Sequence, residues 1–584
     1  MNNNIIRNFS TPTTGTLNGI QNNTVAGTFQ CQNNQIYNFT TTSGGAGGFS
    51  ANGITWSNAS VTISGNIIYA INSSGTSGGT GGTINGITVL GTATISGNAV
   101  YNLSSNSTNV TIVGISVGAT GTNNVNNNLV GDLRAPNSTG NISISGILVS
   151  SGTTNNIFHN SVNIASTTSS ASTFGTSAIY FSSSAPVNNL RNNVFVNTSA
   201  PGPTGGFTAA IRYTAAPTTT NFPATNNNNF YYAGSPATNR LIYGETSAAT
   251  ATNGQQTIAN YKTYISVTLP APGREGASVS EVPNWVSTNG SNPITDFLKY
   301  NTSTATQIEQ GGGTGTGITA DYAGTARCPG TGCPGGVSAP DMGAWELSGI
   351  AADLTVPSIS YTALPNSLCS NVPTLTATIT DVSGVNVNTG TSPRLYYKKS
   401  TDANTYAGNT SADNGWKFVE TTSTSSPFTF TMDAGLLQSP IVTGDNIQYF
   451  VVAQDNATTP NVGINSGTFT TAPASVGLTS AAFPLTGTIN SYSIVTPVAS
   501  SVTIGASGTY TSLTGASGLF AAINAGGLSD NTVATIIDAS VTETGANALN
   551  QIAYGCSGPV TLTIKPQTTA TLTGSVASGA LIKL

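Results

Sequence analysis

Residues 1–235 carry one short pattern of polar and apolar positions that returns at almost constant spacing. In this pattern an asparagine opens a six-residue segment with apolar residues at its third and sixth positions. The clear copies are NIIRNF, NQIYNF, NIIYAI, NAVYNL and NLVGDL, which begin at Asn4, Asn34, Asn66, Asn98 and Asn128. Looser copies begin at Asn160, Asn193 and Asn229, so the eight starts are 30, 32, 32, 30, 32, 33 and 36 residues apart. A period of about 32 residues predicts a stacked repeat architecture.

Each period contains two further apolar patches. One is Gly-Ile or an equivalent pair, with its second residue at Ile20, Ile54, Ile87, Ile115, Ile147, Ile179 and Ile211. The other precedes the asparagine and includes Ile63, Ile95, Val125, Ile157 and Leu190. All three patches alternate apolar with polar residues, as half-buried strands do, and turn-forming residues separate them. Three strands per period predict a parallel β-helix, because a propeller needs four strands and longer repeats.

A β-helix places equivalent residues of successive coils directly above one another. A repeated charge would then face its like, whereas asparagine side chains can form a hydrogen-bonded ladder. We expect such a ladder at Asn4, Asn34, Asn66, Asn98, Asn128, Asn160 and Asn193. The ionisable groups of this region fit the same picture, since they are only Arg7, Asp132, Arg134, His159, Arg191 and Arg212, apart from tyrosine and cysteine. Richness in Asn, Gly, Ser and Thr can also signal disorder, but the regular apolar positions favour the ladder.

The period is lost in residues 236–350, which we interpret as the last coils of the β-helix and its closing cap. A short helix is expected at Gln255–Ile265, and the segment finishes with APDMGAWEL at Ala339–Leu347. A cap is expected because an open coil end would expose unpaired strand edges.

Residues 351–495 change to longer alternating strands. These are expected at Thr374–Asp381, Arg394–Lys399, Trp416–Thr421, Phe428–Asp433 and Asn446–Asp455. The pattern predicts an immunoglobulin-like or fibronectin type III-like sandwich, although Cys369 alone does not supply the cysteine pair of antibody domains.

Residues 496–584 are interpreted as the N-terminal cap and first coils of a second, truncated β-helix. SGLFAAINAGG predicts a short helix with Ser517 as N-cap and Gly526 just past its end. Strands are expected at Thr532–Asp538, Val560–Lys565 and Ala580–Leu584. Because the sequence starts inside a repeat and stops inside an expected strand, we expect it to continue into further modules of the same polypeptide.

Composition excludes several functions. Charged residues are 6% of the chain and the formal net charge is −5, against a usual charged share of about a quarter. Without a basic patch, nucleic-acid binding is not expected. No apolar run approaches the length of a membrane-spanning helix, so we expect no membrane insertion in this segment. The N-terminus also lacks the features of a signal peptide.

The five cysteines leave two possibilities open. Cys328 and Cys333 could form a disulfide in the cap, which would suit an oxidising exterior, or remain two inert thiols. A zinc site needs four ligands, and neither histidine nor another cysteine pair is close in sequence. We expect no cofactor. A structural calcium ion involving Asp445 and Asp455 stays open, although no EF-hand pattern is present.

Candidate catalytic groups in the coils are few. Glycoside hydrolysis usually requires two carboxyl groups, and polysaccharide elimination requires a base. The coils offer Asp132, which we expect to form an exposed ion pair with Arg134, and His159, which we interpret as a surface or stacked histidine. In the cap, Asp321, Asp341 and Glu346 could approach one another, and we expect structural hydrogen bonds there. No catalytic or metal-binding residue is therefore assigned.

The coils offer residues for two kinds of binding surface. Tyr37, Tyr69 and Tyr101 recur in successive coils and could stack on sugars, or could form an aromatic ladder that only stabilises the coils. A flat threonine array of the ice-binding type is not expected, because by their spacing Thr83, Thr88, Thr92, Thr94 and Thr111 do not align from coil to coil.

Several phrases resemble large modular surface proteins of the Bacteroidota. They are the asparagine coils, ITADYAGTAR and APDMGAWEL within Ile318–Leu347, RLYYKKSTDANT, ADNGWKFVE, GDNIQYFVVAQD and GTYTSLTGASGLFAAINAGG. In such proteins right-handed β-helix modules alternate with immunoglobulin-like modules. The resemblance implies secretion, by the type IX route, and a stalk or adhesin-like role. The family's C-terminal sorting domain is missing from this sequence.

These observations predict a non-enzymatic, extracellular, adhesin-like module that spaces or presents binding surfaces at the cell surface. Surface glycans or other cells are the expected partners. The rival hypothesis is a carbohydrate-active β-helix protein that binds polysaccharide or, less consistently with the scarce carboxylates, cleaves it.

Overall fold

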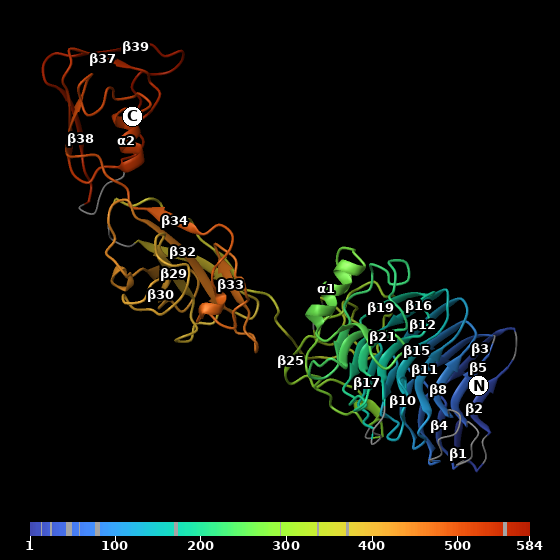
Figure 1. The fold of residues 1–584 in the computed structure, drawn as a ribbon. Helices are drawn as coiled ribbons and strands as arrows, with labels where there is room; N and C mark the ends of the chain where they lie inside the picture. The colour runs from blue at the N-terminus through green and yellow to red at the C-terminus, as the bar shows by residue number, and fades with distance from the viewer. Residues whose placement is uncertain are drawn as a thin grey trace. The chain divides into compact units, whose positions relative to one another are not determined.

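The computed structural model describes residues 1–12, 15–23, 26–42, 49–57, 59–75, 82–168, 173–291, 294–335, 338–368, 373–552 and 558–584. Cys369 and Cys556 lie outside these ranges. The chain divides into two compact units, Met1–Ala352 and Asp353–Leu584. Strands make up almost all of the regular secondary structure in both units, and the first unit contains a parallel β-solenoid (Figure 1).

The solenoid has three sheets. Along most of the solenoid, each coil contributes one strand to each sheet. The first sheet follows the Asn motif and contains β1 (Ile5–Thr11), β4 (Gln35–Thr41), β7 (Ile67–Ser73), β10 (Ala99–Ser105), β13 (Leu129–Gly131), β14 (Leu133–Arg134), β17 (Ser161–Ile164), β20 (Val194–Asn197) and β22 (Phe230–Tyr232). Its strands pair in parallel.

The second sheet contains the Gly-Ile positions. Its strands are β2 (Thr16–Asn22), β5 (Ser50–Trp56), β8 (Gly82–Val89), β11 (Val110–Val117), β15 (Ile144–Val149), β18 (Thr176–Phe181), β21 (Thr208–Tyr213), β23 (Arg240–Glu245) and the antiparallel β24 (Thr252–Gln255). The third sheet contains β3 (Thr28–Gln32), β6 (Ser60–Ser64), β9 (Ala93–Ser96), β12 (Thr122–Asn126), β16 (Thr154–Phe158) and β19 (Val187–Arg191). The expected coil of three strands, repeated at the period of the sequence pattern, is confirmed.

The apolar residues of the three sheets meet in one continuous core along the solenoid. The Gly-Ile repeat follows from this packing, because the glycine lies where two sheets approach closely. A Cβ atom added to Gly53 would lie 2.5 Å from the Ile68 side chain and 2.6 Å from the Gly86 carbonyl oxygen. The isoleucine after each glycine fills the interior, where Ile54 and Ile87 are fully buried neighbours.

The asparagine ladder is also confirmed. The Nδ2 atom of Asn34 donates to Oδ1 of Asn66 at 2.8 Å, and Asn66 donates in the same way to Asn98 at 2.9 Å. The series runs unbroken from Asn4 to Asn193 and continues to Asn229. Each Oδ1 also accepts the backbone N–H of the preceding ladder asparagine, as Asn98 does from Asn66 at 3.0 Å. The amides therefore satisfy buried backbone groups at every corner.

The far end of the solenoid is closed by α1 (Ile258–Thr268), which Figure 1 shows beside the last coils. The expected helix begins three residues later than predicted, because Thr257 caps it by accepting the N–H of Asn260. Tyr261 and Ile265 of α1 are buried against the end of the core. The remaining cap residues do not stay at this end, as described below.

The second unit contains two antiparallel sheets between residues 353 and 495. One consists of β27 (Ser358–Ser360), β28 (Thr374–Thr380) and β31 (Phe428–Thr431). The other consists of β30 (Lys417–Glu420), β29 (Arg394–Lys399), β32 (Asn446–Gln454), β33 (Val462–Asn465) and β34 (Asn490–Ser493). Leu375 and Phe430 of the first sheet share a hydrophobic cluster with Leu395 and Val451 of the second, so the two sheets pack on each other.

Residues 496–584 contain parallel strand pairs again. β35 (Ser501–Ile504), β36 (Thr532–Ile536) and β38 (Leu562–Pro566) form one sheet, and β37 (Ser540–Glu543) pairs with β39 (Thr571–Gly574). Two predictions are wrong here. The helix α2 (Leu519–Gly526) has Gly518 as its N-cap in place of Ser517 and ends one residue later than expected. The expected strand at Ala580–Leu584 does not form, and β39 is the last strand of the described chain.

Short elements complete the described structure of both units. β25 (Ala305–Thr306) pairs with β26 (Ile350–Ala351), and 3-10 turns occur at Ile294–Asp296, Ala434–Leu436 and Ser480–Ala482. No helix in the described part of the chain has the length and apolar character needed to cross a bilayer.

Candidate functional site

A long irregular segment that follows the end cap runs back along the outer surface of the first sheet. We call residues 294–347 the strap; residues 336–337 within it lie outside the described ranges. Phe297, Tyr300 and Trp345 of the strap share a hydrophobic cluster with Leu129 and Val194, which point outward from the first sheet. The predicted closing cap therefore has two parts, with α1 covering the end of the solenoid and the strap covering one flank.

The strap is fixed by a column of corner residues that precede the ladder asparagines. Their backbone is left-handed in every coil, with φ between 55° and 66° at Asn3, Asn33, Gly65, Gly97, Asn127, His159, Asn192 and Asn228. Asn, Gly and His are among the residues that tolerate this conformation best. Four of these side chains reach the strap, since Asn127 bonds Ala320, His159 bonds Thr316, Asn192 bonds Gly313 and Asn228 bonds Gly311.

Of the two positions expected for His159, surface or stacked, the structure rules out the first, because the residue lies in the corner column between Asn127 and Asn192. Its side chain is fully buried, with Nε2 lying 3.0 Å from Nδ2 of Asn192 and 3.2 Å from the Thr316 hydroxyl. Since an amide NH2 group can only donate, Nε2 accepts from Asn192 and the ring is neutral. Burial holds the pKa of His159 well below its usual range, and the nearby Arg327 acts in the same direction. The histidine is therefore a corner residue that supports the strap.

Asp132 occupies a second left-handed column, which crosses the strands of the first sheet. Asn8, Asn38, Ala70, Asn102 and Asp132 have φ between 53° and 63°. The predicted ion pair is present, because the Asp132 carboxylate contacts Arg134, whose guanidinium also contacts Asn102. The pair is partly exposed, with 45% of the Arg134 side chain accessible. Asp132 is the carboxylate variant of a repeated asparagine position.

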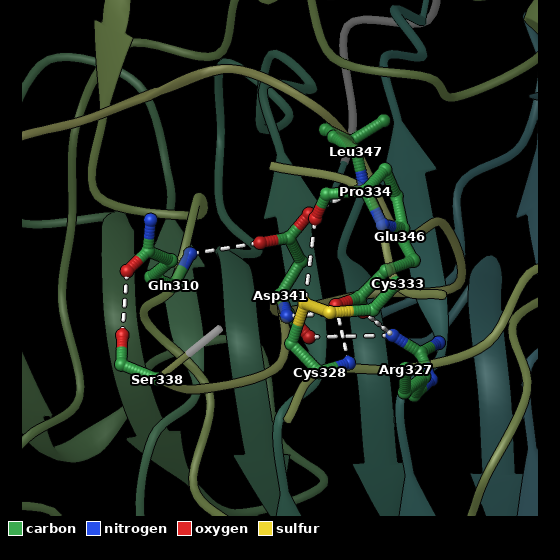
Figure 2. Close-up of a disulfide and its surroundings, with 9 residues drawn as sticks. All are labelled: Gln310, Arg327, Cys328, Cys333, Pro334, Ser338, Asp341, Glu346 and Leu347. Carbon is green, nitrogen blue, oxygen red and sulfur yellow. Dashed lines mark hydrogen bonds and ion pairs between the residues drawn. A yellow bond between two sulfur atoms is a disulfide. The ribbon is translucent and has the colours of Figure 1, made fainter. Parts of the chain in front are cut away.

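The three cap carboxylates predicted to approach one another do so inside the strap, and Figure 2 shows Asp341 and Glu346 of this group. Glu346 pairs with Arg327 at 3.0 Å and accepts the backbone N–H of Cys328 at 2.9 Å. Asp341 accepts the N–H of Gln310 on one oxygen and the N–H of Leu347 on the other. Asp321 accepts the N–H of Glu346 at 2.9 Å. Backbone N–H groups thus occupy the carboxylate oxygens that a reaction would need.

Burial changes the protonation behaviour of this cluster. It raises the pKa of Asp341 to about 8 and also raises that of Glu346, while it lowers the pKa of Arg327. Their exposed fractions are only 1% for Asp341, 6% for Glu346 and 4% for Arg327. Because a general acid or base must reach its substrate, this geometry suits a fixed polar cluster that folds the strap.

A disulfide joins Cys328 and Cys333 next to the same cluster (Figure 2). It closes a short loop whose preceding residue is Arg327, and the Arg327 guanidinium donates to Asn127 of the corner column at 2.8 Å. The bond therefore holds the loop in the region where the strap is tied to the coils. Cys31, a third cysteine, is buried and free.

The three repeated tyrosines form an aromatic ladder. The Tyr37 and Tyr69 rings stack at 4.7 Å, and the Tyr69 and Tyr101 rings stack at 5.0 Å. Phe297 of the strap covers Tyr101, which is only 4% exposed, and Arg7 lies over Tyr37. Stacking on a sugar requires an open ring face. The glycan-stacking interpretation is therefore wrong for Tyr101, and the faces of Tyr37 and Tyr69 are largely occupied by their neighbours.

The second unit brings three carboxylates together, but not the expected pair. Ligand oxygens of Asp353, Asp381 and Asp455 lie within 4.8 Å of one another. Asp445 instead pairs with Lys399 at 2.7 Å. Hydrogen bonds satisfy the group, as Asp455 accepts from Asn461 and Asp353 from Thr355. The Thr355 hydroxyl lowers the pKa of Asp353 to about 2.

Sequence reasoning missed the corner column and Arg327. A signal for the corner column was available, because the residue before each of the eight pattern asparagines is Asn, Gly or His. Arg327 gave no comparable signal, since its partners Asn127 and Glu346 are 200 and 19 residues away.

Comparison with known proteins adds no assignment to this geometry. No protein-family model matches the sequence, and neither a curated protein nor a solved structure is significantly similar to the chain.

Proposed function

We propose that this chain is a non-enzymatic, extracellular module of a large bacterial surface protein. In this proposal the solenoid acts as an adhesin-like spacer that presents binding surfaces at the cell exterior. The resemblance to modular Bacteroidota surface proteins motivates the location and the secretion by the type IX route. Surface glycans or other cells are the proposed partners.

The proposal of a non-enzymatic module depends on one observation: the candidate catalytic groups of the solenoid unit have structural roles. His159 and Asp132 occupy left-handed backbone positions, while Asp321, Asp341 and Glu346 bind backbone N–H groups inside the strap. Each of these groups has a structural partner, and the carboxylates of the strap are almost inaccessible. A hydrolase or lyase site would need such groups to face a substrate.

The proposal includes the identity of the other modules. The two packed antiparallel sheets of residues 353–495 support an immunoglobulin-like or fibronectin type III-like sandwich. The parallel pairs β35–β36–β38 and β37–β39 support the beginning of a second β-helix, since their pairing repeats the spacing of one coil. A chain of alternating modules would suit a spacer.

A carbohydrate-active β-helix protein is the second candidate. Its support is the exposed amide and hydroxyl surface of the coils, which could bind polysaccharide without cleaving it. Cleavage is less well supported, because the described coils present one partly exposed carboxylate, Asp132, already paired with Arg134.

Two measurements test the proposal. Antibodies against the purified chain should label intact cells of the source organism, and external protease should remove the signal. Incubation with neutral and acidic polysaccharides should release neither reducing ends nor unsaturated sugars. Turnover that disappears in Asp132→Asn or Asp341→Asn would instead assign an enzyme.

A further inference from the structure

One flank of the solenoid remains accessible along the described coils. In the third sheet, inward residues of the core alternate with more accessible outward residues in the strands from β3 to β19. By contrast, all residues of β18 and β21 in the second sheet are buried, and so are those of β20 in the first sheet, where the strap packs. The third sheet is therefore the flank that keeps accessible outward residues in all six of its strands, whereas the first and second sheets do so mainly in their earlier coils.

One column of accessible side chains on this flank is polar and uncharged. Strand register places Gln30, Thr62, Thr94, Asn124, Asn156 and Asn189 side by side in six successive coils. The parallel column beside it contains Ser64 and Ser96 and ends with Phe158 and Arg191, whose guanidinium is bound to strap carbonyl groups. We call the column from Gln30 to Asn189 the polar flank. The expectation that coil threonines do not align is wrong, because Thr62 pairs with Thr94 here and Thr83 pairs with Thr111 on the second sheet.

Three of the four amides in the polar flank are held in fixed orientations by bonds to one another. Asn156 donates to Oδ1 of Asn124 at 2.9 Å, and Asn189 donates to Oδ1 of Asn156 at 2.7 Å. A side-chain amide has two N–H donors and an oxygen with two lone pairs. After these bonds, Asn156 still has one donor and one acceptor for a partner, and such positions repeat about every 4.8 Å along the axis. Because the side chains are already ordered, binding loses little rotamer entropy.

We propose that the polar flank binds an extended neutral polysaccharide that lies along the solenoid axis. This inference rests on the proposed function and names a surface and a ligand class for it. Sugar hydroxyl groups donate and accept at the same time, as the free amide positions require. The column from Gln30 to Asn189 carries no charge with which to select an acidic polymer. Each hydrogen bond adds little net affinity, but bonds repeated over six coils act together.

An ice surface is the competing partner for a flat polar sheet. The composition of the polar flank favours a polysaccharide over ice. Four of its six residues carry amides, and only Thr62 and Thr94 are threonines. Amides provide directional donors and acceptors for sugar hydroxyls, whereas the regular threonine pairs of an ice-binding array are missing from most coils.

The test uses the purified full chain and insoluble cellulose, chitin, xylan and mannan in co-sedimentation assays. Alginate and pectate gels serve as acidic comparisons, and ice-affinity capture is run in parallel. The test variant is Thr62→Val with Thr94→Val, which removes two hydroxyl groups from adjacent coils of the polar flank. The matched control is Thr83→Val with Thr111→Val, the same change in adjacent coils of the second sheet.

We expect at least one neutral polysaccharide to retain the chain, with retention unchanged in high salt because no charge pairs are involved. The test variant should bind roughly tenfold more weakly, as expected for the loss of two hydrogen bonds, and the control should bind like the parent. Circular dichroism checks that both variants fold.

Four results would overturn the inference. They are no retention on any neutral polymer, retention only on acidic polymers, equal weakening in both variants, and capture by ice without polysaccharide binding. Failure of the proposed function has a different readout, because an enzyme would release soluble sugars from the polymer while the binding assay is running.

Discussion

At the scale of single residues, backbone conformation decides which side chains the coils accept. Asp132 and His159 look like chemical groups in the sequence, yet each stands in a column where other coils have asparagine, alanine or glycine with positive φ. Asn, Asp and His are the non-glycine residues that most readily adopt this conformation. A residue type that suggests catalysis can therefore be selected by the geometry of a turn.

This explanation predicts how His159 responds to substitution. His159→Asn should lower the free energy of unfolding by about 1 kcal/mol or less, because asparagine occupies the same column in neighbouring coils. His159→Val should cost about 1–3 kcal/mol more, since a β-branched residue is strained at positive φ. Urea unfolding of both variants measures the difference. Equal losses would show that the backbone conformation is not the deciding factor.

The ladder makes a second prediction at this scale. Asn98→Ala removes the acceptor of the Asn66 N–H and the donor to the Ile63 carbonyl. Each buried group left unsatisfied costs about 1–3 kcal/mol, so we expect a loss of about 3 kcal/mol or more. Asn85→Ala is the control, because Asn85 is half-buried and donates to Asn52 on the outer surface. Its loss should be about 0.5 kcal/mol, the lower end for a single hydrogen bond. An equal loss in the two variants would contradict the ladder's role.

At the scale of elements, local sequence patterns predict the strands but not the strap that covers the first sheet. The strands follow from alternation and period, which depend on neighbouring residues. The strap could not be predicted in the same way, because Phe297, Trp345 and their partners Leu129 and Val194 are far apart in sequence. Burial of Tyr101 depends on the strap as well, so the error about its exposure has the same cause. Ala580–Leu584 was predicted from alternation alone, but it pairs with no strand of the described chain.

The strap should be sensitive to loss of its buried ion pair. Arg327→Ala would leave Glu346 buried without its cation, which typically costs about 3–5 kcal/mol. We expect faster hydrogen exchange across residues 305–347 and earlier protease cleavage there. Arg134→Ala removes the exposed ion pair with Asp132 and should change stability by about 1 kcal/mol or less. Unchanged exchange in Arg327→Ala would show that the cluster does not hold the strap.

The end cap should make stability depend on pH. Glu275 is fully buried, with the Tyr231 hydroxyl donating to one carboxylate oxygen and the Ser278 hydroxyl to the other. Burial raises its pKa from 4.5 to about 7. The folded chain therefore binds this proton more tightly than the unfolded chain, and stability from this group falls as pH rises from 4.5 to about 7.

The corresponding change in the free energy of unfolding is about 3 kcal/mol. Unfolding measurements across this range should show a shallower decline in Glu275→Gln, which keeps the shape of the side chain and removes its titration. An identical pH profile in parent and variant would assign the decline to other groups.

At the scale of the whole molecule, a repeat can be inferred from period alone, while its modules need packing information. The solenoid, its three sheets and its ladder were predictable because every coil repeats the same buried apolar positions and the same stacked asparagine. The second unit was predictable only as packed antiparallel strands, since a sandwich type depends on strand connections and not on alternation. The left-handed corners leave a signal in the sequence, since Asn, Gly or His precedes each ladder asparagine, but this signal alone does not reveal the strap that binds there.

The coil repeat predicts which deletions the solenoid tolerates. Removing residues 34–65 joins Asn33 to Asn66 and takes out one complete coil, so the remaining coils can stack in register. This variant should keep its β-sheet circular dichroism and a cooperative unfolding transition. Removing residues 34–49 takes out half a coil and shifts every following contact. It should fail to fold cooperatively, and equal behaviour of the two deletions would contradict a register-dependent solenoid.

The direction of the asparagine ladder has one more consequence. Every amide in it donates toward the C-terminal coil, so all of its dipoles point the same way. A duplicated coil can join this stack only in the orientation that tandem duplication produces. Gain or loss of whole repeats would then change the length of the solenoid by one coil spacing at a time. The contacts between neighbouring coils would stay the same.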